Sequence, residues 1–164
     1  MTTYPKDTIR ELVAGTLPWP QTKRIMSAYK DEDRFFKYLE VLQERVAWPE
    51  KILLPISDHL FIVEGEDGRV TKCECGQVFG PYQRNWKLGA HIRVRDTPEA
   101  LRELYPNSDI PDPAWMEIRE FVCQGCGTLH EVEACAPGYP IVHDFQPDLE
   151  GFYRDWLNQP LPAR

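Results

Sequence analysis

Two pairs of closely spaced cysteines are the side chains in this sequence best suited to chemistry. The first pair, Cys73 and Cys75, lies in the segment C-E-C-G, and the second, Cys123 and Cys126, lies in C-Q-G-C-G. Zn²⁺ prefers four soft ligands in a tetrahedron, and two turns that each supply two thiolates can build that shell. The glycine after each pair can take a positive φ, which turns backbone N–H groups toward the sulfurs. We therefore predict a zinc site with these four cysteines as its ligands.

Other interpretations of the cysteines stay open. The thiols could be buried and reduced without a metal. Cys123 and Cys126 could form a redox pair, although the strand-to-helix context of such pairs is missing. His130 could replace one thiolate, whereas Cys135 is expected to be a packing residue outside the site. Four cysteine ligands leave no position for water or substrate, so the predicted zinc is structural rather than catalytic.

Short strands on both sides of each cysteine pair would position the sulfurs. Alternating and β-branched residues predict strands at His59–Val63, Arg69–Cys73, Ile118–Val122 and Leu129–Glu133. The segment E-G-E-D-G at 64–68 is a turn that joins the first two strands into a hairpin. Hairpins that bring two cysteine pairs together form a zinc-ribbon-like antiparallel core.

The residues between the pairs, 76–122, must form an inserted strand and helix. The segment Trp86–Arg95 alternates apolar and polar side chains, which predicts a half-buried strand. Its outer face would be basic and would carry Lys87, His91, Arg93 and Arg95. This face could be solvated, could dock an acidic partner, or could contact nucleic acid. Thr97 as N-cap and Pro98 in the first turn predict the start of the inserted helix.

The two ends of the chain differ from this core. A capping box at Thr8–Glu11 and an apolar stripe after Asp31 predict helices within 1–50. Prolines divide the C-terminal residues, which include one short helix predicted to start at Asp148. We therefore predict a single α+β domain over residues 1–164. It has a helical region at 1–50, a zinc-ribbon-like β core at 51–136 and a proline-rich arm at 137–164.

The composition limits the classes of function. The 164 residues include 26 acidic and 19 basic side chains, a net charge of -7, so the chain would repel nucleic acid and anionic membranes. The apolar run Ile52–Ile56 is far shorter than the ~20 residues of a membrane helix. The first residues do not resemble a signal peptide, so a cytoplasmic protein with reduced thiols is expected. The sequence has no phosphate-binding loop, no G-x-G-x-x-G and no G-x-S-x-G.

Six segments together resemble the gamma-subunit family of acetone carboxylases. They are Phe35–Arg45, Asn85–Leu88, Arg95–Glu99, Cys123–His130, His143–Phe145 and Asp148–Tyr153. These segments run from the predicted third helix nearly to the C-terminus, so the resemblance covers most of the chain. The family's zinc ligands would fall on Cys73, Cys75, Cys123 and Cys126. Cys135 departs from the family pattern.

The resemblance implies a multi-subunit, ATP-dependent ketone carboxylase that joins a ketone to bicarbonate and forms a β-keto acid. Two large hydantoinase-like subunits, of alpha and beta type, would carry ATP and a catalytic manganese. This chain would be the small, zinc-bearing and non-catalytic partner. Aromatic residues of the arm, 137–162, are then expected to pack partly on a large subunit.

Two other hypotheses for the function remain open. One is a stand-alone zinc-ribbon module that binds protein or nucleic acid, although the charge of -7 opposes a nucleic-acid partner. The other is an enzyme in its own right, for which the sequence shows no nucleophile paired with a base.

Overall fold

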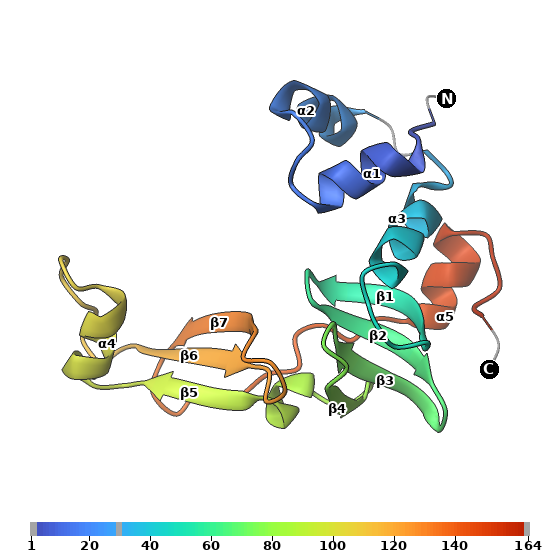
Figure 1. Cartoon of the computed structure of the whole chain (residues 1–164). Coiled ribbons are helices and arrows are strands. Elements are labelled where there is room, and N and C mark those ends of the chain that lie inside the picture. Colours follow the sequence, from blue (N-terminus) through green and yellow to red (C-terminus); the bar gives the residue numbers. More distant parts are fainter. Residues whose placement is uncertain (1–2, 29–30, 163–164) are drawn as a thin grey trace.

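The computed structural model describes residues 3–28 and 31–162 and has two antiparallel sheets beside each other (Figure 1). In the first sheet, of order β1-β2-β3-β4, the strands are Lys51–Ser57, Leu60–Gly65, Gly68–Cys73 and Val78–Pro81. In the second sheet, of order β5-β6-β7, they are His91–Arg95, Glu117–Val122 and Leu129–Cys135. The predicted α+β class is confirmed, but its β core is divided between two sheets.

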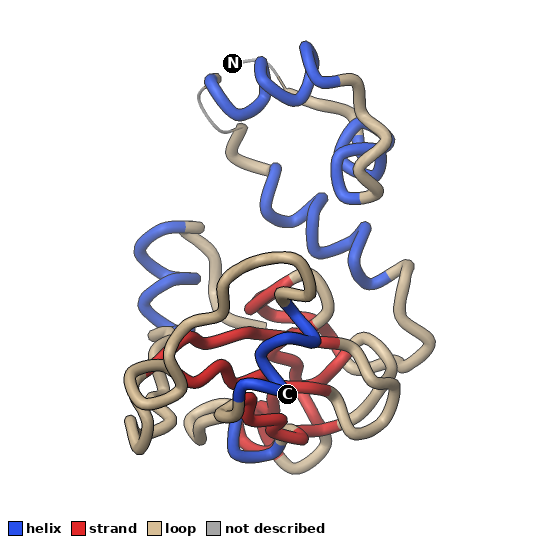
Figure 2. The backbone as a smooth tube through the Cα atoms, turned by 90° about the vertical axis from the view of Figure 1, so that its left-hand side faces the viewer, coloured by secondary structure: helices blue, strands red, loops and turns tan. Residues whose placement is uncertain are grey.

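Seven helical segments accompany these sheets in the described part of the chain. The α-helices are α1 (Lys6–Val13), α2 (Trp19–Ser27), α3 (Arg34–Gln43), α4 (Pro98–Leu104) and α5 (Leu149–Gly151). A 3-10 helix, η1, spans Trp86–Gly89, and α5 continues into a π-helix, η2, at Phe152–Trp156. Helices α1 and α2 lie beyond α3 and away from both sheets (Figures 1 and 2). Each helix in this part is too short to span a bilayer.

The core of the first sheet forms around β2, whose sequence L-F-I-V is continuously apolar. Its residues 60–63 are all at most 1% exposed, because both faces of the strand are covered. On one face, Phe61 and Val63 pack against the α3 side chains Leu39 and Leu42. On the other face, Ile62 packs against Leu149 of α5. The apolar stripe predicted for the third helix is therefore confirmed as its core face.

A second core joins the two sheets. Leu60 of β2 packs with Trp86 and Ala90 of the η1 segment and with Phe121 of β6. We call residues 86–146 the distal lobe; it comprises η1, α4, the β5–β7 sheet and the first part of the arm (Figure 1). This apolar contact joins the distal lobe to the first sheet, and the cysteine pairs described below lie at the same junction.

The predicted basic face of the inserted strand is only partly formed: His91 and Arg93 of β5 are exposed as expected, but Lys87 and Arg95 are not. Residues 86–89 form η1, because the Asn85 side chain accepts a 3.1 Å hydrogen bond from the backbone N–H of Lys87 and starts a helical turn. Lys87 and Arg95 are buried and paired with carboxylates rather than displayed on an outer face. Leu88 and Val94, which were expected to point inward, are exposed. Arg93 stays exposed but is paired with Glu103 at 2.6 Å, which favours the solvated alternative for this face over a docking or nucleic-acid surface.

Several element boundaries also differ from the sequence predictions. Helix α1 begins at Lys6 after Pro5, so Thr8 lies inside the helix and does not cap it. Strands β1 and β4 were not predicted. Both end in or contain proline, at Pro55 and Pro81, and both lie at a sheet edge, where a missing backbone N–H is tolerated.

The helix of the C-terminal arm folds back onto this chain. Asp148 caps it as predicted, with its side chain accepting a 2.9 Å hydrogen bond from Gly151 N–H. Tyr153 is 1% exposed, and its hydroxyl donates a 2.8 Å hydrogen bond to the Leu53 carbonyl of β1. Burial raises the pKa of Tyr153 to about 12, which keeps the hydroxyl protonated as a donor at neutral pH.

Replacing Tyr153 by phenylalanine is expected to lower the free energy of unfolding by about 1–2 kcal/mol. The Leu53 carbonyl would lose its donor in a buried site, while the ring would still fill the same space. Urea denaturation of the variant measures the loss. Tyr139→Phe is the matched control, because Tyr139 is exposed and its change should leave stability within about 0.5 kcal/mol. Equal stability of both variants would show that the hydrogen bond contributes nothing.

Candidate metal centre

Two equivalent turns present the cysteine pairs. Strand β3 ends at Cys73, and the turn closes with a 2.8 Å hydrogen bond from Cys73 N–H to the Gln77 carbonyl. The second turn lies between β6 and β7 and closes from Cys123 N–H to the Thr128 carbonyl, also at 2.8 Å. The glycines after the pairs have φ of +102° at Gly76 and +77° at Gly127. The sequence interpretation of these glycines as turn-forming residues is confirmed.

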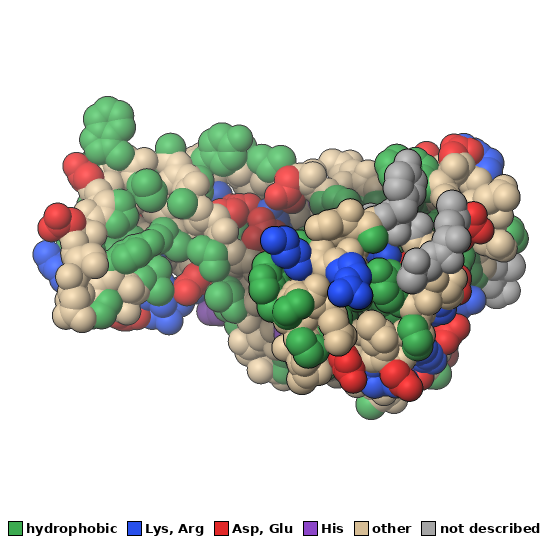
Figure 3. All heavy atoms as spheres, turned by 90° about the horizontal axis from the view of Figure 1, so that it is seen from above, with side chains coloured by type: hydrophobic (Ala, Val, Ile, Leu, Met, Phe, Trp, Pro, Cys, Tyr) green, Lys and Arg blue, Asp and Glu red, His purple; other side chains and the backbone are tan. Residues whose placement is uncertain are grey.

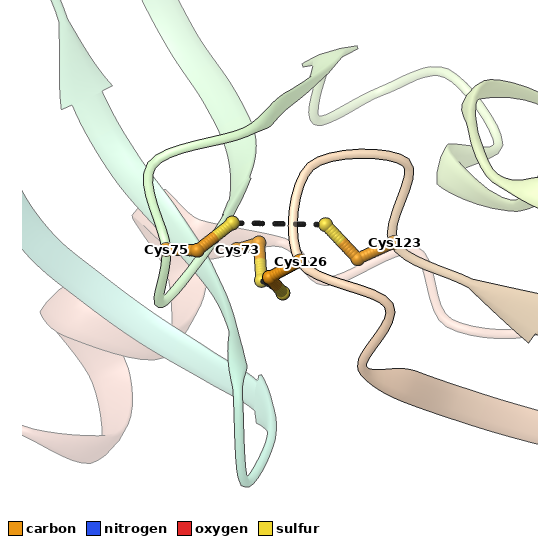
Figure 4. Close-up of side chains that lie close together, drawn as sticks. All are labelled: Cys73, Cys75, Cys123 and Cys126. Carbon is orange, nitrogen blue, oxygen red and sulfur yellow. Dashed lines mark hydrogen bonds between the residues drawn. The ribbon is translucent and has the colours of Figure 1, made fainter.

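The four sulfurs converge between the two turns, as Figure 4 shows. The Sγ atoms of Cys73 and Cys126 are 3.8 Å apart, and those of Cys75 and Cys123 are 3.7 Å apart. All four lie within 4.8 Å of one another. A tetrahedral zinc with Zn–S bonds of 2.3 Å has an S···S edge of about 3.8 Å. The residues present therefore fit a four-thiolate metal ion.

The four thiols differ in their burial and in the hydrogen bonds that their sulfurs accept. Burial raises the pKa of Cys73 and, to a smaller extent, that of Cys75. The Thr128 hydroxyl lies 3.1 Å from the Cys126 sulfur, and hydrogen bonding from Thr128 lowers the pKa of Cys126 to about 6. Gly125 N–H donates a 3.3 Å hydrogen bond to the sulfur of Cys123. These donors stabilise negative charge on the sulfurs, which is the form that binds a metal.

Glu74 anchors the first turn to the main body of the protein. Its carboxylate lies 2.5 Å from Nδ1 of His59 and 3.2 Å from a guanidinium nitrogen of Arg45. Its backbone carbonyl accepts a 3.0 Å hydrogen bond from the indole of Trp48. The cysteine turn is thus fixed to the end of α3 and to the β1–β2 turn. No local pattern could predict these contacts, because the partners are distant along the chain.

The two other candidate residues lie outside the cysteine cluster. His130 packs edge-on against Phe79 and Trp86, with ring centroids 5.5 and 5.8 Å away. Among the described residues its ring nitrogens have no hydrogen-bond partner, and burial lowers its pKa, which favours the neutral imidazole. Cys135 lies at the end of β7 remote from Cys126, and its sulfur is 3.8 Å from a carboxylate oxygen of Glu117.

A second cluster of acidic side chains surrounds a lysine, and the sequence analysis missed it. The carboxylates are those of Glu131 and Glu133 on β7 and of Asp144 in the arm. The Lys87 ammonium lies 2.7, 2.6 and 3.0 Å from them, and its side chain is fully buried. Burial alone would lower the pKa of Lys87, but the hydrogen bonds that its ammonium donates to the three carboxylates outweigh burial and raise the pKa well above the usual range. This ammonium occupies the position that a metal ion would need.

Comparison with known proteins identifies the family. A family model described as acetone carboxylase gamma subunit matches residues 46–157. The acetone carboxylase gamma subunit of Xanthobacter autotrophicus (strain ATCC BAA-1158 / Py2) is 46% identical over 163 residues, which cover 98% of this chain and 97% of that protein. The acetophenone carboxylase beta subunit of Aromatoleum aromaticum (strain DSM 19018 / LMG 30748 / EbN1) is 26% identical over 111 residues, 66% of this chain and 79% of that protein. The chain therefore belongs to the acetone carboxylase gamma subunit family.

Proposed function

We propose that this chain is a small, zinc-binding and non-catalytic subunit of an ATP-dependent ketone carboxylase. Two large hydantoinase-like subunits, of alpha and beta type, would bind ATP and manganese and convert a ketone and bicarbonate to a β-keto acid. The observation that carries the proposal is the 46% identity to an acetone carboxylase gamma subunit over 98% of the chain. The complex would work in the cytoplasm, where thiolates stay reduced.

The arrangement of the four cysteines supports a structural zinc with Cys73, Cys75, Cys123 and Cys126 as ligands. Each pair belongs to a different sheet, so one metal ion would join the first sheet to the distal lobe. Four sulfurs fill a tetrahedral shell and leave no coordination position for a substrate. Zinc in this position would therefore stabilise the fold rather than take part in the reaction.

The isolated chain is expected neither to hydrolyse ATP nor to carboxylate a ketone. Its sequence offers no glycine-rich loop to hold phosphates, and the proposed zinc has no open position. The measurement is phosphate release from ATP by the purified chain, with and without acetone and bicarbonate. Ketone-stimulated release in the absence of any other subunit would contradict a non-catalytic role.

The proposed function is tested by reconstitution with the large subunits. Those subunits, expressed with this chain, should show ketone-stimulated ATP hydrolysis, and subunits expressed without it should lose assembly or activity. Acetone, butanone and acetophenone, tried in turn, would identify the class of ketone. Full activity without this chain would reject the proposal. Tight binding of the purified chain to nucleic acid would instead favour the stand-alone zinc-ribbon module, which the charge of -7 opposes.

A further inference from the structure

Exposed apolar side chains are concentrated on the distal lobe. Among the described residues, eleven of the fifteen large apolar side chains that are exposed lie within 86–146, which is well under half of the chain. They are Leu88, Val94, Leu104, Tyr105, Trp115, Met116, Leu129, Val132, Tyr139, Val142 and Phe145. Figure 3 shows apolar side chains over much of the visible face of this lobe, at the left of the view. Apolar surface gathered in this way is typical of a protein-binding face.

Trp115 is the most exposed of these side chains and is held by a well-defined turn. It is 80% exposed. Asp112 organises the turn: its side chain accepts a 2.9 Å hydrogen bond from Ala114 N–H, and its carbonyl accepts hydrogen bonds from Trp115 and Met116 N–H at 2.9 and 3.0 Å. Pro113 restricts the backbone between them. A tryptophan presented by an ordered turn loses little conformational entropy when it enters a pocket, which favours binding.

The charge of this region indicates the chemistry of its partner. Residues 86–146 include ten acidic and five basic side chains, a net charge of -5. Segment 103–118, which carries Trp115, has no lysine or arginine. Of its four acidic side chains, Glu103 and Glu117 pair with arginines of the lobe, whereas Asp109 and Asp112 are exposed. A second copy of the chain would bring like charges together at this face, and an anionic membrane would repel it. The complementary surface is an apolar pocket with a basic rim on a different protein.

We propose that the distal lobe docks onto a large subunit of the carboxylase through Trp115, which inserts into an apolar pocket rimmed by lysine or arginine. This inference rests on the proposed function and deepens it by naming the face that binds. It also moves the expected interface. The arm helix with Trp156 packs on the main body, whereas Tyr139 and Phe145 of the arm belong to the distal lobe.

The test compares two tryptophans of similar exposure in different parts of the molecule. The affinity of the full-length chain for the large subunits is measured by biolayer interferometry for wild type, Trp115→Ala and Trp156→Ala. Trp156 is 83% exposed but lies in η2, outside the distal lobe. We expect Trp115→Ala to weaken binding about 30-fold or more, as for a buried aromatic anchor, and Trp156→Ala to change it less than about twofold. Salt should weaken wild-type binding, because opposite charges attract across the interface.

The outcomes distinguish docking on a large subunit from self-association and from the absence of any large partner. Both variants should keep the zinc content and melting temperature of wild type, since both side chains are exposed. A Trp115→Ala chain that binds as tightly as wild type would overturn the docking face and leave the proposed function intact. Wild type that forms a dimer in light scattering, with the dimer lost in Trp115→Ala, would show that the occupant is a second copy and would overturn the proposal. Wild type that does not bind the large subunits at all would overturn the proposed function and this interface with it.

Discussion

Replacing Cys126 by serine is expected to abolish zinc binding and to leave a chain that misfolds or aggregates. The variant retains three thiolates, and a structural zinc site with an incomplete shell loses binding energy on the order of 10 kcal/mol. That loss is comparable with the whole stability of a domain of this size. The consequence should be greatest at the junction of the first sheet and the distal lobe, which the proposed zinc would join. Metal analysis of the purified variant and its thermal unfolding are the measurements.

Cys135→Ser is the matched control for this experiment. Cys135 lies at the opposite end of β7 and contacts Glu117 rather than the other sulfurs. The variant should keep full zinc content and a melting temperature near that of wild type. Zinc loss in Cys135→Ser, or wild-type zinc content in Cys126→Ser, would contradict the ligand assignment. The zinc-loaded wild type should also unfold in one cooperative transition, as predicted for a single domain over 1–164.

Replacing Lys87 by methionine is expected to destabilise the protein by about 3–5 kcal/mol. Removing the charge from a buried ion cluster leaves its partners uncompensated, and here three carboxylates would face one another. The arm should also loosen, because Asp144 is one of those partners. Denaturant unfolding measures the change in free energy, and hydrogen exchange of residues 137–147 reports on the arm.

The dependence on pH distinguishes this effect from a general packing defect. The pKa of Lys87 is raised, so in wild type its contribution is fully present below the ordinary lysine value of 10.5 and is lost only as pH rises through the raised value. Wild type should therefore keep this contribution between pH 7 and 9. The Lys87→Met variant should gain stability relative to wild type as pH falls toward 5. Protonation then removes the repulsion between the three carboxylates that have lost their partner.

Lys6→Met is the control for a lysine on the surface. Lys6 contacts Glu40 and Glu44, each at 2.7 Å, but these groups are open to solvent. Its replacement should have little effect on stability, because exposed ion pairs contribute little. Equal losses for Lys6→Met and Lys87→Met would show that burial of the cluster does not matter.

The cysteine pairs could be located from the sequence because their chemistry depends on short, fixed spacing. The ligand turn needs only two cysteines, a following glycine and flanking strands, all within a few residues. The hairpin of β2 and β3 was predicted for the same reason, with its turn at 64–68; in the structure Gly65 and Gly68 are the last pair before that turn. What the sequence could not show is that the two cysteine pairs belong to different sheets. That arrangement depends on Leu60 and Phe121, which meet in the inter-sheet core although they are distant along the chain.

The predicted exposure of Lys87 was wrong, because an alternating pattern alone does not distinguish a solvated charged side chain from a buried one. A lysine in a polar position is normally exposed, but three carboxylates from β7 and the arm reverse that preference here. Asn85 was the one local signal for a helical turn, since asparagine is a favoured N-cap.

The C-terminal helix predicted to start at Asp148 does not continue as an α-helix, and the reason is geometric. Residues 152–156 form a π-helix, and Leu157 N–H bonds to the Phe152 carbonyl, five residues back. This wider turn shifts the phase of the side chains relative to an α-helix. Tyr153 stays buried, whereas Trp156 turns outward to solvent.

Native mass spectrometry of the complex, purified through a tag on this chain, tests the carboxylase assignment and the metal centre in one measurement. We expect an assembly of this chain with two kinds of large subunit. After dissociation, the small chain should carry the mass of one zinc ion, and Cys126→Ser should remove that mass. A wild-type chain that is recovered alone and without zinc would contradict both the carboxylase assignment and the four-cysteine metal centre.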